Sequence, residues 1–269
     1  MKKQRKRSKY NPKYKNKDKY NKKSNFLIDV WYDTKKYFEI NRIWIPPSIK
    51  YNINDLNEIN IANNYQNTIV EIVNTDSFNL GINYVDEGLR PLILNMASDF
   101  RPGGGVDKGK IAQEEELFRR SNAHLTHPKS WYPLDTNEII YSPEITIIKD
   151  TTNRKYEYLK NKEIVSMIAC AAIRNPRLVE GKYNKNDYDL IYSKIEAIFK
   201  IAIEQNHDSI VLGAFGCGAF HNPPEEVASI FNIIINKYRT NFKKIGFAVL
   251  VVKKPDYENL NAFKKIIIQ

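Results

Sequence analysis

Cysteines and long apolar runs are scarce in this sequence. Its 269 residues include two cysteines, Cys170 and Cys217, which are too few for a disulfide framework and indicate reduced thiols. The first residues are positively charged, but no apolar segment follows them as a secretory signal requires. No apolar run reaches the ~18 residues that a membrane-spanning helix needs. We therefore expect an intracellular protein, cytoplasmic or nuclear.

Acidic residues are almost missing from the first 24 positions. Residues 1–24 contain twelve Lys or Arg and a single acid, Asp18. The whole chain has a net charge of +11, and the part after residue 24 is formally neutral because its basic and acidic residues are equal in number. Without apolar periodicity, residues 1–24 are predicted to be a disordered tail. Such a tail fits contact with nucleic acid or another polyanion, a nuclear-import signal, or a solvated segment without a partner.

Apolar side chains recur with helical or strand periodicity from residue 27 onward. They predict helices at 27–38, 113–124, 187–204, 225–238 and 259–267. They predict strands at 68–73, 92–96, 144–149, 164–170, 209–212 and 245–252. The alternation of strands and helices implies an α/β fold of three layers with a mostly parallel or mixed central sheet. Ligands bind such sheets at the carboxyl ends of strands, where segments 74–77, 95–105 and 213–222 are expected.

Glycine dominates one of these segments. A short apolar run ends in the polar Asn95, and three consecutive glycines occupy positions 103–105. Residues without side chains weaken a helix or strand, but they let backbone N–H groups approach an anion such as a phosphate. Seven residues later the motif Gln-Glu-Glu at 113–115 begins a predicted helix. The pattern favours a phosphorylated substrate with acid–base chemistry beside it.

A P-loop is the competing interpretation of the same glycines. Gly104 to Lys110 spells Gly-x-x-x-x-Gly-Lys, the core of a nucleotide-triphosphate site. Ile111 follows, however, where that site needs a Ser or Thr hydroxyl for Mg²⁺. We therefore do not expect a nucleoside triphosphatase.

A second loop of small residues lies at 213–222, between a predicted strand and a predicted helix. Its glycines and alanines fit a turn around a phosphate, and two such loops at neighbouring strand ends are able to hold a diphosphate from both sides. Cys217 within it has no accompanying His and Asn pattern of a nucleophile. His124, His127 and His221 lack the further ligands of a metal site. We expect neither a metal nor a cofactor.

Taken together, these motifs resemble the microbial-type poly(ADP-ribose) glycohydrolases, a family with a macrodomain-related fold. The resemblance rests on Gly-Gly-Gly, seven residues, then Gln-Glu-Glu, and on similar pieces such as 94–97, 119–122, 140–144, 171–176 and 212–224. It covers roughly residues 27–255 and leaves residues 1–24 outside. It implies a catalytic domain over 25–269, with 25–66 as an N-terminal extension packed on it. One departure is the charged link 98–101 before the glycines.

The resemblance also implies roles for individual residues. Glu115 matches the catalytic glutamate, Glu114 the acid that holds a substrate ribose, and Asn95 the amide that orients the terminal ribose. Phe220 matches an aromatic residue over that ribose, and Asp76 more weakly an aspartate that contacts adenine. The remaining expected substrate contacts are Ala97, Gly103, Gly104, Gly105, Gln113, Gly213, Ala214, Phe215, Gly216, Cys217, Gly218 and Ala219.

The implied reaction is hydrolysis of the ribose–ribose O-glycosidic bonds of ADP-ribose polymers on modified proteins. A ribose hydroxyl leaves poorly unless it is protonated, so one acid is required. Glu114 and Glu115 are adjacent and project differently from a helix, so we expect Glu115 to act alone, first as acid and then as base. Burial is expected to keep it protonated. Hydrolysis of another ADP-ribosyl linkage and a non-catalytic ADP-ribose reader stay open, and we expect a monomer.

Overall fold

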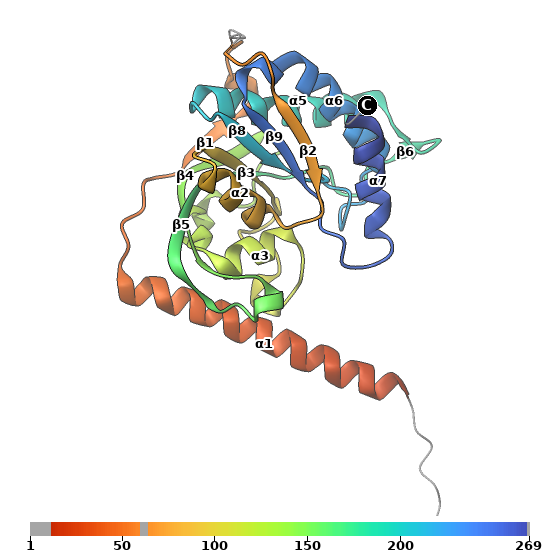
Figure 1. Ribbon diagram of the computed structural model, residues 1–269. Helices are drawn as coiled ribbons and strands as arrows, with labels where there is room; N and C mark the ends of the chain where they lie inside the picture. Colours follow the sequence, from red (N-terminus) through yellow and green to blue (C-terminus); the bar gives the residue numbers. More distant parts are fainter. Residues whose placement is uncertain (1–11, 60–63, 268–269) are drawn as a thin grey trace, which may run out of the picture.

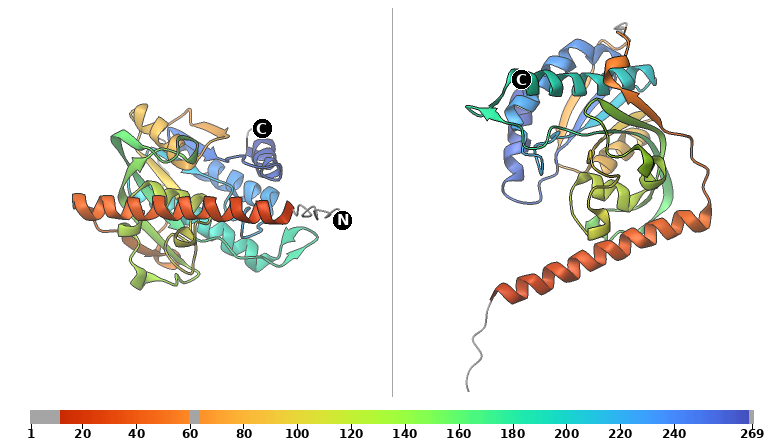
Figure 2. Two further views of the ribbon diagram at one scale, coloured as in Figure 1. Left: turned by 90° about the horizontal axis from the view of Figure 1, so that it is seen from below. Right: turned by 180° about the vertical axis from the view of Figure 1, so that it is seen from behind.

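The computed structural model describes residues 12–59 and 64–267, and it describes only the backbone of residues 12–21. The first element is the 30-residue helix α1, Pro12–Asn41. It lies across one end of the body, and its N-terminal half extends past the body (Figures 1 and 2). The disorder predicted for residues 12–24 is therefore corrected to helix, because Pro12 suits a first helical turn and no Gly or Pro follows before Asn41. Residues 1–11 of the predicted tail lie outside the described residues.

The C-terminal half of α1 is bound to the body by one apolar face. Leu27, Trp31 and Phe38 lie on this face at helical spacing, and each is less than 10% exposed. Thr34, on the same face, donates a hydrogen bond to the carbonyl of Arg119. Lys149 donates to the carbonyl of Val30 at 3.0 Å. The helix predicted for 27–38 is thus confirmed, and the body anchors it.

The central sheet of the described residues has seven strands in the order β1-β4-β5-β3-β8-β9-β2. Its strands are β1 Ile49–Asn52, β2 Ile69–Val73, β3 Pro91–Met96, β4 Glu138–Lys149, β5 Tyr158–Cys170, β8 Ser209–Leu212 and β9 Lys244–Ala248. Pairs from β5 to β2 are parallel, whereas β1, β4 and β5 pair antiparallel. The predicted mixed sheet is confirmed. A separate hairpin is formed by β6 Leu178–Val179 and β7 Lys182–Tyr183.

Helices cover both faces of the sheet and make the predicted three-layer fold (Figures 1 and 2). One buried cluster joins the sheet to α5 Lys185–Glu204, α6 Pro224–Tyr238 and α7 Asp256–Ile267. The opposite cluster joins it to α1, α2 Ser77–Asp86 and α3 Gln113–Arg120. A short helix, α4 Ala123–Thr126, follows α3 where one continuous helix to 124 is predicted. Among the described residues, no helix combines the length and apolar character of a membrane span.

Candidate active site

Polar loops follow the three adjacent parallel strands β5, β3 and β8, so their carboxyl ends share one edge of the sheet. The loop after β3 carries the three glycines and leads into α3, which begins with the Gln-Glu-Glu motif. The loop after β8 is the predicted second glycine loop. We call residues 98–105 the first loop and residues 213–222 the second loop. Both loops therefore start from the same edge of the sheet.

Gln113 ties the start of α3 to the end of β3. Its side-chain oxygen accepts from the Met96 amide at 2.9 Å, and its side-chain nitrogen donates to the Leu94 carbonyl at 2.6 Å. The same nitrogen donates to the Ser77 hydroxyl at the start of α2, at 3.0 Å. All three bonds join parts of the protein to one another. Gln113 therefore fixes the loop geometry, whereas the sequence predicts a substrate contact.

Glu114 is buried beneath the first loop. Its two carboxyl oxygens accept from the amides of Ser98 at 2.8 Å and Gly103 at 3.1 Å, and the residue is 4% exposed. Burial raises the pKa of Glu114 to about 8, and the charge of Glu115 adds to this increase. The two backbone bonds act in the opposite direction but do not prevail. Glu114 thus holds a proton at neutral pH in the folded protein.

Glu115 is held from the same loop. Its Oε1 accepts from the Gly105 amide at 2.8 Å, and the residue is 7% exposed. Gly104 adopts φ +52°, and a Cβ built there would lie 2.8 Å from Glu115 Oε1 and 3.1 Å from Glu114 Oε2. The loop therefore needs glycine at this position because the two carboxyl groups lie against its backbone. Residue 104 donates its own amide to the Arg101 carbonyl at 3.3 Å.

The amides of the first loop are consequently not free for a phosphate. Those of Gly103 and Gly105 bind the two glutamates, and that of Gly104 binds a carbonyl. In this structure the glycines hold the acids, and the phosphate contact that the sequence predicts for them stays a prediction. The physical reason is proximity: the seven-residue connection returns α3 directly beneath the glycines, so its own carboxylates reach the N–H groups first.

The second loop presents its amides differently. Within the described residues, the amides of Phe215, Gly216, Gly218 and Ala219 have no hydrogen-bond acceptor. Three other amides of the loop are paired: that of Cys217 donates to the Ala214 carbonyl at 3.0 Å, that of His221 to the Gly218 carbonyl at 3.1 Å, and that of Asn222 to the Gly216 carbonyl at 3.0 Å. Gly218 and Ala219 are exposed. Several unpaired N–H groups in one small-residue loop are what an anion site requires.

Asn222 fixes the shape of this second loop. Its side-chain nitrogen donates to the carbonyls of Ile173 at 2.7 Å and Gly216 at 3.1 Å, and its oxygen accepts from the Tyr183 hydroxyl at 2.7 Å. Gly216 has φ +73°, and a Cβ there would lie 2.4 Å from the Asn222 side chain and 2.6 Å from Ala172. Asn222 therefore fixes the backbone of the second loop through its side chain, a role that the sequence does not predict.

Phe220 is held by a cation that no sequence motif identifies. The Arg174 guanidinium lies over its ring, 3.9 Å from the centroid. The same guanidinium donates to Asp99 at 2.8 Å and to the Ser98 hydroxyl at 3.3 Å. The charged link at 98–101 thus connects the first loop to the second through the loop after β5. Asp99 belongs to the one departure from the family pattern, but no spacing pairs it with Arg174.

Asn95 lies at the centre of the site without a hydrogen bond. It is fully buried, and neither atom of its amide has a hydrogen-bond partner among the described residues. Its amide lies beside the Glu114 carboxyl, and this polar contact lowers the pKa of Glu114 although it does not reach hydrogen-bond geometry. The Tyr132 hydroxyl, also buried and unpartnered in this part of the chain, lies near enough to Glu114 for that charge to raise its pKa. Buried polar groups normally pair, so these two point to a ligand.

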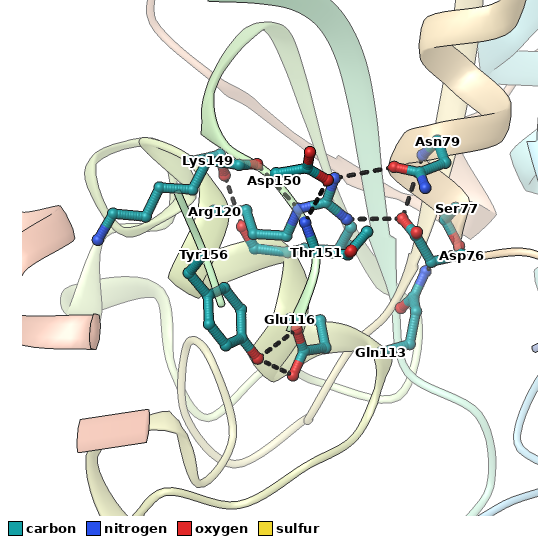
Figure 3. Close-up of polar contacts among 12 residues, drawn as sticks. Asp76, Ser77, Asn79, Gln113, Glu116, Arg120, Lys149, Asp150, Thr151 and Tyr156 are labelled. Carbon is teal, nitrogen blue, oxygen red and sulfur yellow. Dashed lines mark hydrogen bonds and ion pairs between the residues drawn. The ribbon is translucent and has the colours of Figure 1, made fainter. Parts of the chain in front are cut away.

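Ala97 and Asp76 both have partners within the protein, and their predicted substrate contacts stay predictions. Ala97 is buried, and its amide donates to the Cys170 carbonyl at 3.0 Å. Asp76 caps α2, and its Oδ1 accepts from the Asn79 amide at 3.1 Å and from buried Arg120 at 2.7 Å (Figure 3). Only Oδ2 of this carboxylate is left without a partner among the described residues.

The remaining titratable side chains belong to the fold. His124 and His127 are packed among aromatic rings, and burial lowers the pKa of each to about 4. Glu116, next to Glu115 in sequence, accepts from the Tyr156 hydroxyl at 2.7 Å (Figure 3). Burial raises the pKa of the Cys217 thiol, which argues against a nucleophile.

Known proteins share this sequence pattern and fold. The family model described as "Microbial-type PARG, catalytic domain" matches residues 13–150. Its match begins inside the segment 1–24, which the motifs of the sequence leave outside the resemblance. A search of curated protein sequences found no match.

Solved structures of poly(ADP-ribose) glycohydrolase (PARG) superpose on the chain. The PARG of Thermomonospora curvata is 21% identical with a TM-score of 0.73, and the alignment covers 89% of this chain and 98% of that chain. The PARG of Deinococcus radiodurans in complex with ADP-ribose is 26% identical with a TM-score of 0.66, and the alignment covers 77% and 87%. The Thermomonospora enzyme bound to the inhibitor ADP-HPD is 23% identical with a TM-score of 0.70, and the alignment covers 89% of this chain and 98% of that chain. The chain therefore belongs to the microbial-type poly(ADP-ribose) glycohydrolase family and carries its catalytic, glycosidase domain.

Proposed function

We propose that this protein releases ADP-ribose from polymers on modified proteins, with Glu115 as the acid and then the base of hydrolysis. The observation that carries the proposal is the clamp on the two acids. Backbone amides of the glycine triplet fix Glu114 and Glu115 in a buried position at the carboxyl end of β3. Hydrogen-bond donors and acids that are already in position before substrate binds stabilise the transition state without further rearrangement of the protein.

Glu115 has one oxygen available for proton transfer. Gly105 occupies Oε1, and no described residue bonds to Oε2. In this proposal Oε2 takes up a proton as the polymer binds, and Oε2–H then gives it to the 2′-oxygen of the departing ribose as the bond from that oxygen to C1″ breaks. In the second step Oε2 takes a proton from water as the water oxygen bonds to C1″, which restores the acid. Neighbouring Glu114 accommodates a proton in its buried position and holds a ribose hydroxyl.

The second loop supplies the diphosphate site in this proposal. Free amides of Phe215, Gly216, Gly218 and Ala219 would bind phosphate oxygens, with Gly213, Ala214 and Cys217 completing the turn. Phe220 would cover the terminal ribose, and Asn95 and Tyr132 would bond to its hydroxyls. Oδ2 of Asp76 would accept from the adenine amine. The ADP-ribose complex of the Deinococcus enzyme, 26% identical, supports a nucleotide-sugar ligand for this fold.

The test is Glu115→Gln assayed on automodified ADP-ribose polymer. Removal of a general acid reduces turnover by about 100- to 10,000-fold, and we expect the variant to bind ADP-ribose as tightly as the parent. Glu116→Gln is the matched control, because Glu116 lies on the same helix but bonds to Tyr156. Equal turnover of Glu115→Gln and parent would remove Glu115 from the mechanism. A parent that binds ADP-ribose without cleaving polymer would be a reader.

Other assignments remain predictions. They are the choice of ADP-ribosyl linkage, contact of the basic N-terminal segment with nucleic acid or its use in nuclear import, and the monomeric state. Release of ADP-ribose from polymer and from mono-ADP-ribosylated protein, compared at equal enzyme concentration, tests the first of them.

A further inference from the structure

A groove separates α1 from the connection between the first loop and α3. It encloses about 260 Å³ and is lined by Lys23, Ser24, Leu27, Gly109, Lys110 and Ile111. Leu27 and Ile111 give it an apolar floor, and the two lysines stand at its rim. None of these residues takes part in the proposed mechanism of Glu115.

The groove has a defined shape. The Ser24 hydroxyl donates to the Lys108 carbonyl at 3.0 Å. Gly109 has φ +64°, and a Cβ there would lie 2.5 Å from the Ser24 carbonyl oxygen, so only glycine allows α1 to approach this closely. On the other side, buried Arg119 donates from both terminal nitrogens to the Lys110 carbonyl. Lys110 is therefore anchored by its backbone while its side chain is exposed.

The rim is positive and unpaired. Lys23 and Lys110 line the groove, and Lys22 and Lys108 lie within two residues of them in the sequence. All four are exposed, and none of them forms an ion pair with an acid of the described residues. The nearby acid Asp107 pairs with Arg101 rather than with one of these lysines, and its Oδ1 lies 3.9 Å from Arg101 Nη2. Some lysines elsewhere on the protein, such as Lys243 and Lys244, do have acidic partners. Free cations around an apolar floor match a ligand that is part aromatic and part anionic.

The groove adjoins the catalytic acid. A Cβ built on Gly105 would lie 2.5 Å from Lys110 Cγ and 3.5 Å from Glu115 Oε1. The Lys110 side chain and the Glu115 carboxyl thus flank the same glycine. The Glu115 carboxyl is accordingly separated from the groove by this single glycine.

We propose that this groove binds the adenosine diphosphate portion of the polymer unit that departs from the cleaved bond. The inference rests on the proposed function. In ADP-ribose polymers the leaving 2′-oxygen belongs to a ribose that carries adenine on one side and a 5′-diphosphate on the other. Adenine would lie on the exposed side chain of Ile111, and the diphosphate between Lys23 and Lys110. The groove would favour polymer over single ADP-ribosyl groups, because only polymer has such a leaving unit.

The experiment compares Lys23→Gln/Lys110→Gln with Lys160→Gln/Lys264→Gln, which removes two exposed lysines elsewhere. Substrates are ADP-ribose polymer and an ADP-ribosyl ether with a small uncharged aryl leaving group. We expect the groove variant to raise KM for polymer by about 10-fold and to flatten its salt dependence, since two phosphate contacts are lost. KM for the aryl ether and the Kd of ADP-ribose should change by less than about twofold.

Binding of polymer is also measured in the Glu115→Gln background, so that the outcome does not depend on turnover. A 10-fold loss of affinity on adding the two lysine changes supports the groove even if the parent proves to be a reader. Equal affinity with and without these changes overturns the proposal. So does an equal rise in KM for polymer and aryl ether, or a single-stranded RNA that displaces polymer from the groove at lower concentration than polymer itself.

Discussion

The two glycine loops at the same edge of the sheet have opposite uses. The first loop turns its amides inward onto the carboxyl groups of Glu114 and Glu115. The second loop leaves the amides from Phe215 to Ala219 largely without acceptors, and Asn222 braces it from behind. Similar composition therefore serves two functions, because each loop leads into a helix with a different first turn.

The difference lies in the residues that begin these helices. α3 begins seven residues after the first loop, and two acids of its first turn, Glu114 and Glu115, accept from N–H groups of that loop. The second loop is followed by Pro223 and Pro224, which carry no N–H groups, and among the described residues no hydrogen bond joins the acids of α6 to the amides of this loop. A glycine-rich loop binds an external anion only where the chain itself supplies none. Four substitutions test this division between the loops.

The largest effect is expected from Gly104→Ala. The new Cβ would press on both carboxyl groups, and displacement of a catalytic group by about 1 Å costs turnover by about 100-fold. Affinity for ADP-ribose should change little, as measured by calorimetry. Gly88→Ala is the control, since Gly88 shares the positive φ but has no atom within 4 Å of the added Cβ. A parallel loss of affinity would mean that the first loop also binds the diphosphate.

Gly216→Ala should act on binding instead. Its Cβ would collide with Asn222 and Ala172 and change the direction of the free amides. Loss of hydrogen bonds to a charged ligand costs about 1.5–3 kcal/mol, so we expect ADP-ribose to bind at least about 10-fold more weakly. Gly218→Ala should bind normally, because nothing lies within 4 Å of its added Cβ. Equal affinities of the two variants would contradict the role of the second loop.

Arg174→Gln tests the bridge between the loops. The ion pair of Arg174 with Asp99 is half exposed, and its contact with the Phe220 ring stabilises the protein only modestly. We therefore expect KM to rise by about 5-fold and the temperature of unfolding to change little. The effect should be smaller in a Phe220→Leu background, because Arg174 acts through that ring. Arg177→Gln, an exposed neighbour, is the control. Additive effects of Arg174→Gln and Phe220→Leu on KM would show that Arg174 acts independently of Phe220.

The smallest effect concerns stability and pH. Folding raises the pKa of Glu114 to about 8, so the protonated form stabilises the folded state. This contribution is complete below the ordinary pKa of a glutamate and is lost as the pH rises through 8. The parent should therefore lose at least about 1 kcal/mol more than Glu114→Gln between pH 5 and pH 8.5, measured by urea unfolding. Parallel pH profiles would mean that Glu114 is ionised throughout.

Periodicity predicted the elements that form the layers. The helix at 187–204 and the strands at 68–73 and 209–212 lie within about two residues of α5, β2 and β8, because each has a continuous apolar face. β1 and α2 were not predicted. β1 is half exposed at the edge of the sheet, and α2 contains Gly81, which a helix tolerates here because Ile93 occupies the space of its missing Cβ.

The candidate site was predictable in its parts but not in its connections. The motif identified the acids, the glycines and Phe220, since their spacing along the chain is short. Contacts across long separations left no pattern, as between Asp99 and Arg174, 75 positions apart. The direction of the N–H groups in the first loop depends on how α3 returns beneath it. Only three-dimensional geometry determines that direction.

Asn95 has a consequence for the whole molecule. A polar amide enclosed without a partner in the described structure makes the unliganded protein less stable than an apolar residue of the same shape would. Selection for folding alone would remove it. Removing this amide from water without a hydrogen bond destabilises the folded protein, and a sugar hydroxyl that bonds to the amide offsets this loss. The ligand should therefore raise the temperature at which the protein unfolds.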